Sequence, residues 1–161
     1  MTIALNDETA HRVRAFARGE MTWAEVERMT WAQARAAMHV GCDMAAADRL
    51  DDAKTVFEGL VALNPKDAAS QAALGTVYQK LGRPADAEAA YSAALRIDPK
   101  NAVALSNRGE FRLKRGDKEG VVDLGLAVEA DPLGETAAGR RAGALLRALA
   151  LRIAAARVER A

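Results

Sequence analysis

The side chains best suited to chemistry in this sequence are His39 and Cys42. They are three residues apart, so they share one face if the segment is helical. A thiolate paired with an imidazole is a reactive nucleophile. However, no third group is placed to orient the imidazole, two ligands are fewer than a zinc site needs, and a buried thiol is the commoner use of a lone cysteine. We therefore predict no catalytic residue, no metal site and no cofactor.

The other polar residues do not change this interpretation. Gly75 and Gly82 lie inside and just after a predicted helix, whereas a phosphate-binding loop lies between a strand and a helix. Carboxylates such as Asp51 and Asp86 stand at predicted helix starts, where they favour the helix dipole. The single cysteine excludes an intramolecular disulfide framework. We predict that the chain is not an enzyme; an enzyme built on Cys42 would instead require a thiol of lowered pKa.

The segment 68–99 predicts a helical hairpin. Apolar residues at helical spacing indicate helices over 68–80 and 84–97. Between them Gly82 supplies the positive backbone angle of a helix end, and Pro84 suits the first turn of the next helix. Small residues on the inner faces, Gly75 and Ala87, allow the two backbones to approach closely.

This hairpin recurs with a period of 34 residues. The shift carries Gly75 onto Gly41 and Gly109, and a one-residue deletion after Gly116 aligns the third copy, which ends at Pro132. The period and the small–small–aromatic–small–Pro pattern resemble the tetratricopeptide repeat (TPR) family. The resemblance implies an all-α fold, an α-α superhelix of three TPR hairpins at 34–65, 68–99 and 102–132 within a single domain, 1–161. The third copy departs from the pattern, with Arg108 and Arg112 at the positions of Leu74 and Tyr78.

Helical segments are predicted on both sides of the repeats. Residues 1–30 read as N-terminal helices. Trp23, and Trp31 just after this segment, either plug the open end of the repeats or belong to a self-association surface, for which Phe16 is a further candidate. Residues 134–160 read as one long C-terminal helix. Its apolar stripe is expected to cover the exposed face of the third repeat; the residues are Leu145, Leu146, Leu149 and Ile153.

Composition bounds the class of partner. The 161 residues carry a net charge of +1, which gives no overall bias toward nucleic acid or acidic membranes. The C-terminal segment from 134 is rich in arginine, but it has no aromatic residue on which bases could stack. A secretion signal and an apolar stretch long enough to span a membrane are both missing from the sequence. We predict a cytoplasmic protein that does not bind nucleic acid and does not insert into a membrane.

The TPR resemblance implies a groove that binds an extended peptide along the first helix of each repeat. Residues matching the inward-facing positions are Met38, Cys42, Ala45, Ala72, Thr76, Gln79, Lys80, Ser106, Glu110, Leu113 and Lys114. Met38 and Cys42 stand where a lysine and an asparagine would be needed to clamp the acidic tails of heat-shock chaperones. That co-chaperone activity is therefore disfavoured.

The layout is similar to a narrower family, the class II chaperones of type III secretion systems. The similarity rests on Phe57–Leu63, Leu74, Gly75, Gln79, Gly82, Tyr91, Ala94, Asp98, Glu110, Leu113, Gly116 and the cadence of Arg141–Leu149. It implies that an unfolded translocator subunit is held in the groove until export, with a homodimer through the N-terminal segment. The alternative is a scaffold or adaptor subunit of a larger assembly, acting through its convex face and the N-terminal tryptophans.

Overall fold

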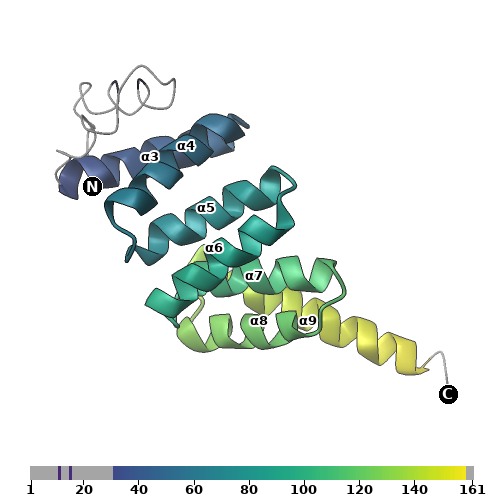
Figure 1. Cartoon of the computed structure of the whole chain (residues 1–161). Coiled ribbons are helices and arrows are strands. Elements are labelled where there is room, and N and C mark those ends of the chain that lie inside the picture. Colours follow the sequence, from purple (N-terminus) through teal and green to yellow (C-terminus); the bar gives the residue numbers. More distant parts are fainter. Residues whose placement is uncertain (1–10, 12–14, 16–30, 159–161) are drawn as a thin grey trace. The chain divides into compact units, whose positions relative to one another are not determined.

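The computed structural model describes residues 11, 15 and 31–158, and every regular element in this part of the chain is an α-helix. Figure 1 shows their order along the chain. The helices are α3 (Trp31–Ala46), α4 (Leu50–Leu63), α5 (Ala68–Lys80), α6 (Pro84–Ile97), α7 (Ala102–Lys114), α8 (Glu119–Ala130) and α9 (Ala137–Val158). The predicted all-α fold of helical hairpins with a long C-terminal helix is therefore confirmed.

The predicted N-terminal helices, with Phe16 and Trp23, lie outside the described residues. Trp31 is the first residue of α3. The self-association role of these three side chains remains a prediction.

The chain forms two compact units, residues 1–90 and 91–161. The first contains α3, α4, α5 and the start of α6, and the second contains the end of α6 with α7, α8 and α9. The single continuous domain expected over 1–161 remains a prediction.

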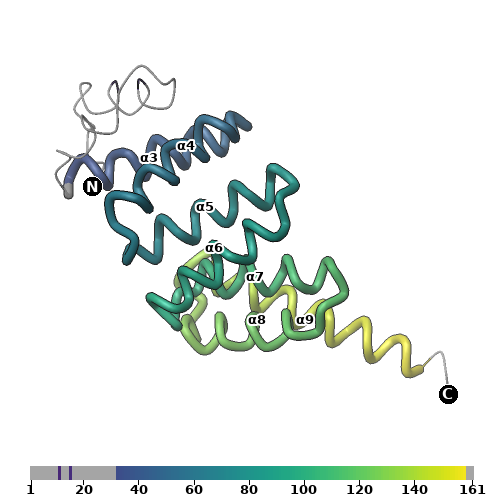
Figure 2. The backbone as a smooth tube through the Cα atoms, in the orientation of Figure 1, coloured from purple at the N-terminus to yellow at the C-terminus, as the bar shows by residue number. Residues whose placement is uncertain are grey.

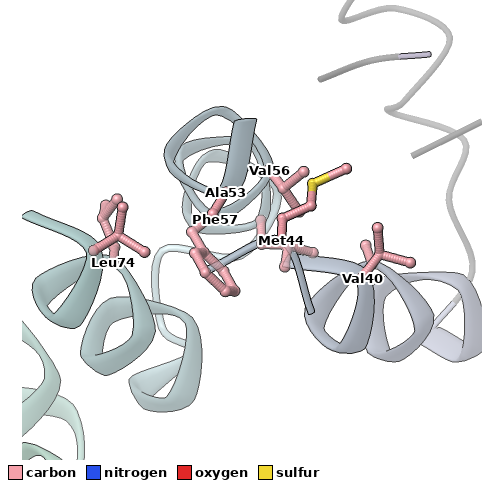
Figure 3. Close-up of a cluster of buried hydrophobic side chains, with 9 residues drawn as sticks. Val40, Met44, Ala53, Val56, Phe57 and Leu74 are labelled. Atoms are coloured by element: carbon pink, nitrogen blue, oxygen red, sulfur yellow. The ribbon is translucent and has the colours of Figure 1, made fainter. Parts of the chain in front are cut away.

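The core of the first unit is built around Phe57 of α4. Figure 3 shows Val40 and Met44 from α3 and Leu74 from α5 converging on the same cluster as this ring. Phe57 is 1% exposed. A Cβ atom on Gly41 of α3 would lie only 2.8 Å from Cε1 and Cζ of the ring, so glycine is required for α3 and α4 to pack at this distance.

The core of the second unit brings α7, α8 and α9 together through Leu105, Leu124, Ala127 and Ala142. Here α7 and α8 approach backbone to backbone. A Cβ atom on Gly109 would lie 2.9 Å from the carbonyl oxygen of Gly120, and one on Gly120 would lie 2.9 Å from the backbone nitrogen of Leu113. Gly41 and Gly109, which the repeat aligns with Gly75, therefore mark the contacts between paired helices.

The same turn closes all three hairpins. Asp48, Gly82 and Gly116 have φ of 60°, 68° and 80°, and they are spaced by 34 residues. In each turn the next residue donates its backbone N–H to a carbonyl five residues earlier, at 2.9 Å, as in a Schellman motif; the pairs are Arg49 to Met44, Arg83 to Tyr78 and Asp117 to Arg112. The repeat thus fixes backbone geometry as well as packing.

The C-terminal helix covers the third repeat with only its first half. Ala138 and Ala142 are buried, and Leu145 and Leu146 pack against the core of the second unit. Ile153, expected to continue this stripe, is 48% exposed. Figure 2 shows α9 running beyond α7 and α8 toward the C-terminus, so the expectation that the whole stripe covers the repeat is wrong for its distal end.

The two arginines that depart from the repeat pattern are held by one buried carboxylate. Asp123 of α8 is 3% exposed and accepts two hydrogen bonds from Arg108, at 2.8 Å and 2.6 Å, and one from Arg112 at 3.0 Å. Arg108 also donates to Ser92 at 3.2 Å. An ion-pair network therefore occupies the positions that Leu74, Tyr78 and Ala90 fill in the second repeat.

We predict that Gly82→Ala lowers the free energy of unfolding by about 1–2 kcal/mol, because alanine must then adopt a left-handed conformation. An added Cβ meets no atom within 4 Å, so the cost is confined to the backbone. Gly125→Ala is the matched control, since this helical position is equally open, and it should raise stability by up to about 1 kcal/mol. Chemical denaturation measures both; equal effects of the two substitutions would contradict the assignment.

We predict that Asp123→Ala destabilises the protein by about 3 kcal/mol or more, because two arginines lose their buried partner. Placing the residues of the second repeat at all three positions should recover most of the lost stability, because well-packed apolar residues can replace a buried ion pair with little change in the free energy of unfolding. The triple variant is Arg108→Leu, Arg112→Tyr and Asp123→Ala. Thermal unfolding followed by circular dichroism compares the two. A triple variant as unstable as the single one would count against this account.

Candidate peptide-binding surface

In the first unit the two first helices of successive repeats are in contact, and a lysine links them. The Nζ atom of Lys80, at the end of α5, donates to the backbone carbonyl of Ala45 at 2.8 Å. This carbonyl lies in the last turn of α3, where carbonyl groups have no partner within the helix and the helix dipole favours a cation. The link therefore fixes the end of α3 beside the end of α5.

A second link joins α5 to α4. The Tyr78 hydroxyl donates to Oε1 of Glu58 at 2.8 Å, and the Arg83 guanidinium lies 4.7 Å from the centre of the tyrosine ring. Desolvation, followed by the Glu58 hydrogen bond and charge, raises the pKa of Tyr78 to about 12. The phenol therefore stays protonated and remains a donor throughout the physiological pH range. Together with the Lys80 link, these contacts attach α5 to both α4 and α3.

We call the predicted groove residues of this unit the α3/α5 surface; they are Met38, Cys42, Ala45, Ala72, Thr76, Gln79 and Lys80. Cys42 and Lys80 are exposed, while Met38, Ala45, Thr76 and Gln79 are partly exposed. Ala72 is 2% exposed and contributes to packing. Thr76 donates its hydroxyl to the Ala72 carbonyl at 3.1 Å, so this donor is directed to its own helix.

In the second unit the predicted groove residues contact other parts of the chain. Glu110 forms ion pairs with Lys114 at 2.7 Å and with Arg141 of α9 at 3.6 Å. Arg141 also hydrogen-bonds Asn107. Leu113 packs into the core, and Ser106 is fully buried. The C-terminal helix therefore shares this face of α7, and Lys114 is the most exposed of the four predicted residues.

The pair that suggested chemistry lacks the environment of a reactive thiol. Partial desolvation, and then the charge of Asp43, raise the pKa of the Cys42 thiol above its ordinary value. A nucleophilic cysteine needs the opposite shift. No group of three or more histidine, cysteine, aspartate or glutamate side chains able to hold a metal ion occurs among residues 31–158 and the two described N-terminal residues.

Sequence reasoning missed three interactions that shape this region: the Lys80 link, the Arg141–Glu110 pair and the Asp123 network. The first two join residues 35 and 31 positions apart, and nothing in the helical period indicates them. The third had a signal. Asp123 aligns with Val56 and Ala90, so a carboxylate replaces apolar residues in the same repeat where two arginines do.

Comparison with known proteins agrees with this geometry. The tetratricopeptide repeat family model matches residues 41–102 and 72–134. The chain belongs to the tetratricopeptide repeat family. The matched residues span the second helix of the first repeat and both hairpins that follow, which are the elements that carry the repeated turns.

Among solved structures, PcrH from Pseudomonas aeruginosa is 27% identical, with a TM-score of 0.67, over 76% of this TPR chain and 95% of PcrH. PcrH in complex with the chaperone binding region of PopD is 26% identical, with a TM-score of 0.68, over 78% of this chain and 96% of PcrH. The Yersinia enterocolitica type III secretion chaperone SycD, in complex with a peptide of the translocator YopD, is 22% identical over 78% of this chain and 98% of its own, with a TM-score of 0.65, and shares the fold. The TPR protein thus resembles translocator chaperones.

A search of curated protein sequences found no significant match. Within the described residues, no helix is both long and apolar enough to cross a membrane.

We predict that Cys42 alkylates as an unactivated thiol. Because its pKa is raised, the thiolate fraction at neutral pH is small, and the alkylation rate should increase with pH to a midpoint higher than that of an ordinary thiol. Iodoacetamide labelling across pH 6–10, followed by mass spectrometry, reads this one site, since the chain has a single cysteine. His39→Ala should leave the profile unchanged. A midpoint below 7 that rises on this substitution would instead indicate an activated pair.

Proposed function

We propose that this TPR protein binds an extended segment of a client protein, and that it does so as a cytoplasmic class II chaperone of a type III secretion system. The client segment lies along α3 and α5, the first helices of the two repeats in the first unit. The binding residues in the first unit are those of the α3/α5 surface other than the buried Ala72. In the second unit, taken by itself, Lys114 of α7 is the exposed member of the predicted set, whereas Ser106 is buried and Leu113 packs into the core.

The observation that carries the proposal is the Lys80 link between α5 and α3. It holds the ends of the two helices that carry the predicted binding residues in a fixed relation. On α3 this surface carries the partly exposed, apolar Met38 and the exposed thiol of Cys42, and on α5 it carries the partly exposed Gln79. An extended peptide needs both apolar contacts for alternate side chains and hydrogen-bonding groups for its backbone.

The chaperone class is supported by the neighbours whose solved complexes match this chain. PcrH was crystallised with the chaperone binding regions of PopD and of PopB, and it matches this chain at 26% and 25% identity in those complexes. The matched region covers 96% and 98% of PcrH. A client of the translocator class is therefore the first to test.

The competing function is a scaffold that works through its second helices. The two proposals place the partner on different helices, α3 and α5 in one case and α4, α6 or α8 in the other. The single cysteine of the chain lies on the α3/α5 surface, so a probe attached to it reports this surface alone.

We predict that a photo-activatable maleimide on Cys42 cross-links the client in cells that express it, and that mass spectrometry maps the cross-links to one contiguous client segment. The matched control carries Cys42→Ser with Ala89→Cys, which moves the probe to an exposed position on the second helix α6. The control should give no cross-link to that segment. If the client cross-links equally to probes at both positions, or only to the probe at position 89, the chaperone proposal is refuted in favour of the scaffold.

A further inference from the structure

Exposed large apolar side chains are concentrated on two elements of the second unit. Among the described residues nine such side chains are exposed, and six of them lie on α8 and on the distal half of α9. These are Val121, Val122 and Leu126 on α8, and Leu151, Ile153 and Val158 on α9. Neither group belongs to the predicted peptide-binding residues.

The apolar face of α8 is specific to the third repeat. Its exposed apolar residues are Val121, Val122 and Leu126. Val121 and Val122 align with Glu88 and Ala89 in the second repeat and with Lys54 and Thr55 in the first. The fold therefore does not require apolar residues there. Val122 is 54% exposed and Leu126 is 43% exposed. A surface that is polar or small in two repeats and apolar in the third is typical of a contact with another molecule.

The shape of this face suits a helix. An added Cβ atom on Gly125 would meet no atom within 4 Å, so the space beside this residue is open. Side chains of one helix pack into such spaces between the side chains of another. The occupant that fits is therefore a helix with exposed apolar side chains.

The distal half of α9 has the properties of that helix. From residue 147 to 158, Leu149 is partly exposed and every other residue is exposed. Leu151 and Val158 are 72% and 78% exposed, and with Ala154 between them they follow the 3–4 spacing of a helix-packing seam. The helical segment 147–158 and α8 each have twelve residues, so both are about 18 Å long.

Charge determines which surfaces pair. Arg147, Arg152 and Arg157 recur every five residues, which places positive charge around the whole distal helix without an acidic residue from 147 to 158. Two distal helices would repel each other. The α8 face carries Glu119 and Glu129, with Lys118, and its net charge is therefore negative. The two carboxylates are ten residues apart, as are Arg147 and Arg157, so each pair spans about 15 Å.

We propose that the distal half of α9 docks on the outward face of α8 in a second copy of this chain. Reciprocal docking of both copies closes a two-fold dimer with two identical contacts. This dimer is separate from the client-binding surface, and it uses different residues from the self-association predicted for the N-terminal tryptophans.

Analytical ultracentrifugation of the full chain tests the proposal. The wild type should sediment as a dimer of twice 17.1 kDa. Val122→Glu on α8, or Leu151→Glu with Val158→Glu on α9, should each raise the dissociation constant at least about tenfold, because a carboxylate then enters the apolar contact. The matched control Ala89→Glu makes the same change at the equivalent exposed position of α6 and should leave the dimer unchanged.

Mixing the two variants identifies the pairing. The Val122→Glu chain keeps an intact distal α9, and the Leu151→Glu/Val158→Glu chain keeps an intact α8 face, so an equimolar mixture should regain a dimer through one contact. All altered positions are exposed, and circular dichroism should show unchanged helix content. A monomeric wild type, a dimer that survives both sets of substitutions, or a mixture that stays monomeric would each overturn the proposal.

Discussion

The fold depends on how closely the two helices of a hairpin can approach. In the first repeat the limit is set by Gly41, whose missing side chain makes room for the Phe57 ring. In the third repeat Leu124 replaces the ring, and glycines at 109 and 120 bring the backbones themselves into contact. Both solutions use the same repeat positions. A methyl group at any of these glycines would force the helices apart and disturb the turn and the neighbouring first helix together.

Close packing of this kind leaves different faces of the helices for different roles. The inner faces are occupied by Phe57, Leu124 and the small residues that meet them. In the third repeat the Asp123 carboxylate is also buried between the helices, because it forms ion pairs with two arginines on α7. What remains at the surface of α3 and α5 is a mixed set in which Lys80 contacts the Ala45 carbonyl. The α3/α5 surface is thus a consequence of the helix spacing that the core sets.

The sequence predicted the elements well, because their causes are local and repeated. The positive backbone angles at Gly82 and Gly116 follow from glycine after a helix, and the helix bounds of 68–80 and 84–97 agree with α5 and α6. The period of 34 then assigned the third repeat despite its arginines. Asp48 differs from the other two turn residues because it is not a glycine, so its residue type does not indicate a left-handed backbone angle. Only its alignment with Gly82 and Gly116 in the repeat does so.

Long-range pairing could not be predicted, because it depends on the relative placement of helices far apart in sequence. The apolar stripe of α9 keeps its helical spacing through Ile153, although Ile153 itself is exposed because α9 extends past the third repeat. The spacing of apolar residues does not indicate how far along α9 the contact with the repeat continues. Glu110 was placed on the groove by its repeat position, and its pairing with Arg141 depends on where α9 crosses α7. For the same reason the exposure of Val122 and Leu126 became visible only in the structure.

The central claim is that the α3/α5 surface holds the client, and equilibrium binding tests it most directly. A fluorescent peptide with the sequence of the cross-linked client segment is titrated with the wild type, with Thr76→Arg on the α3/α5 surface and with Ala89→Arg on the exposed side of α6. The account predicts that Thr76→Arg weakens binding at least about tenfold, by about 1.4 kcal/mol, while Ala89→Arg binds as the wild type does. Equal affinities of the two variants would contradict it.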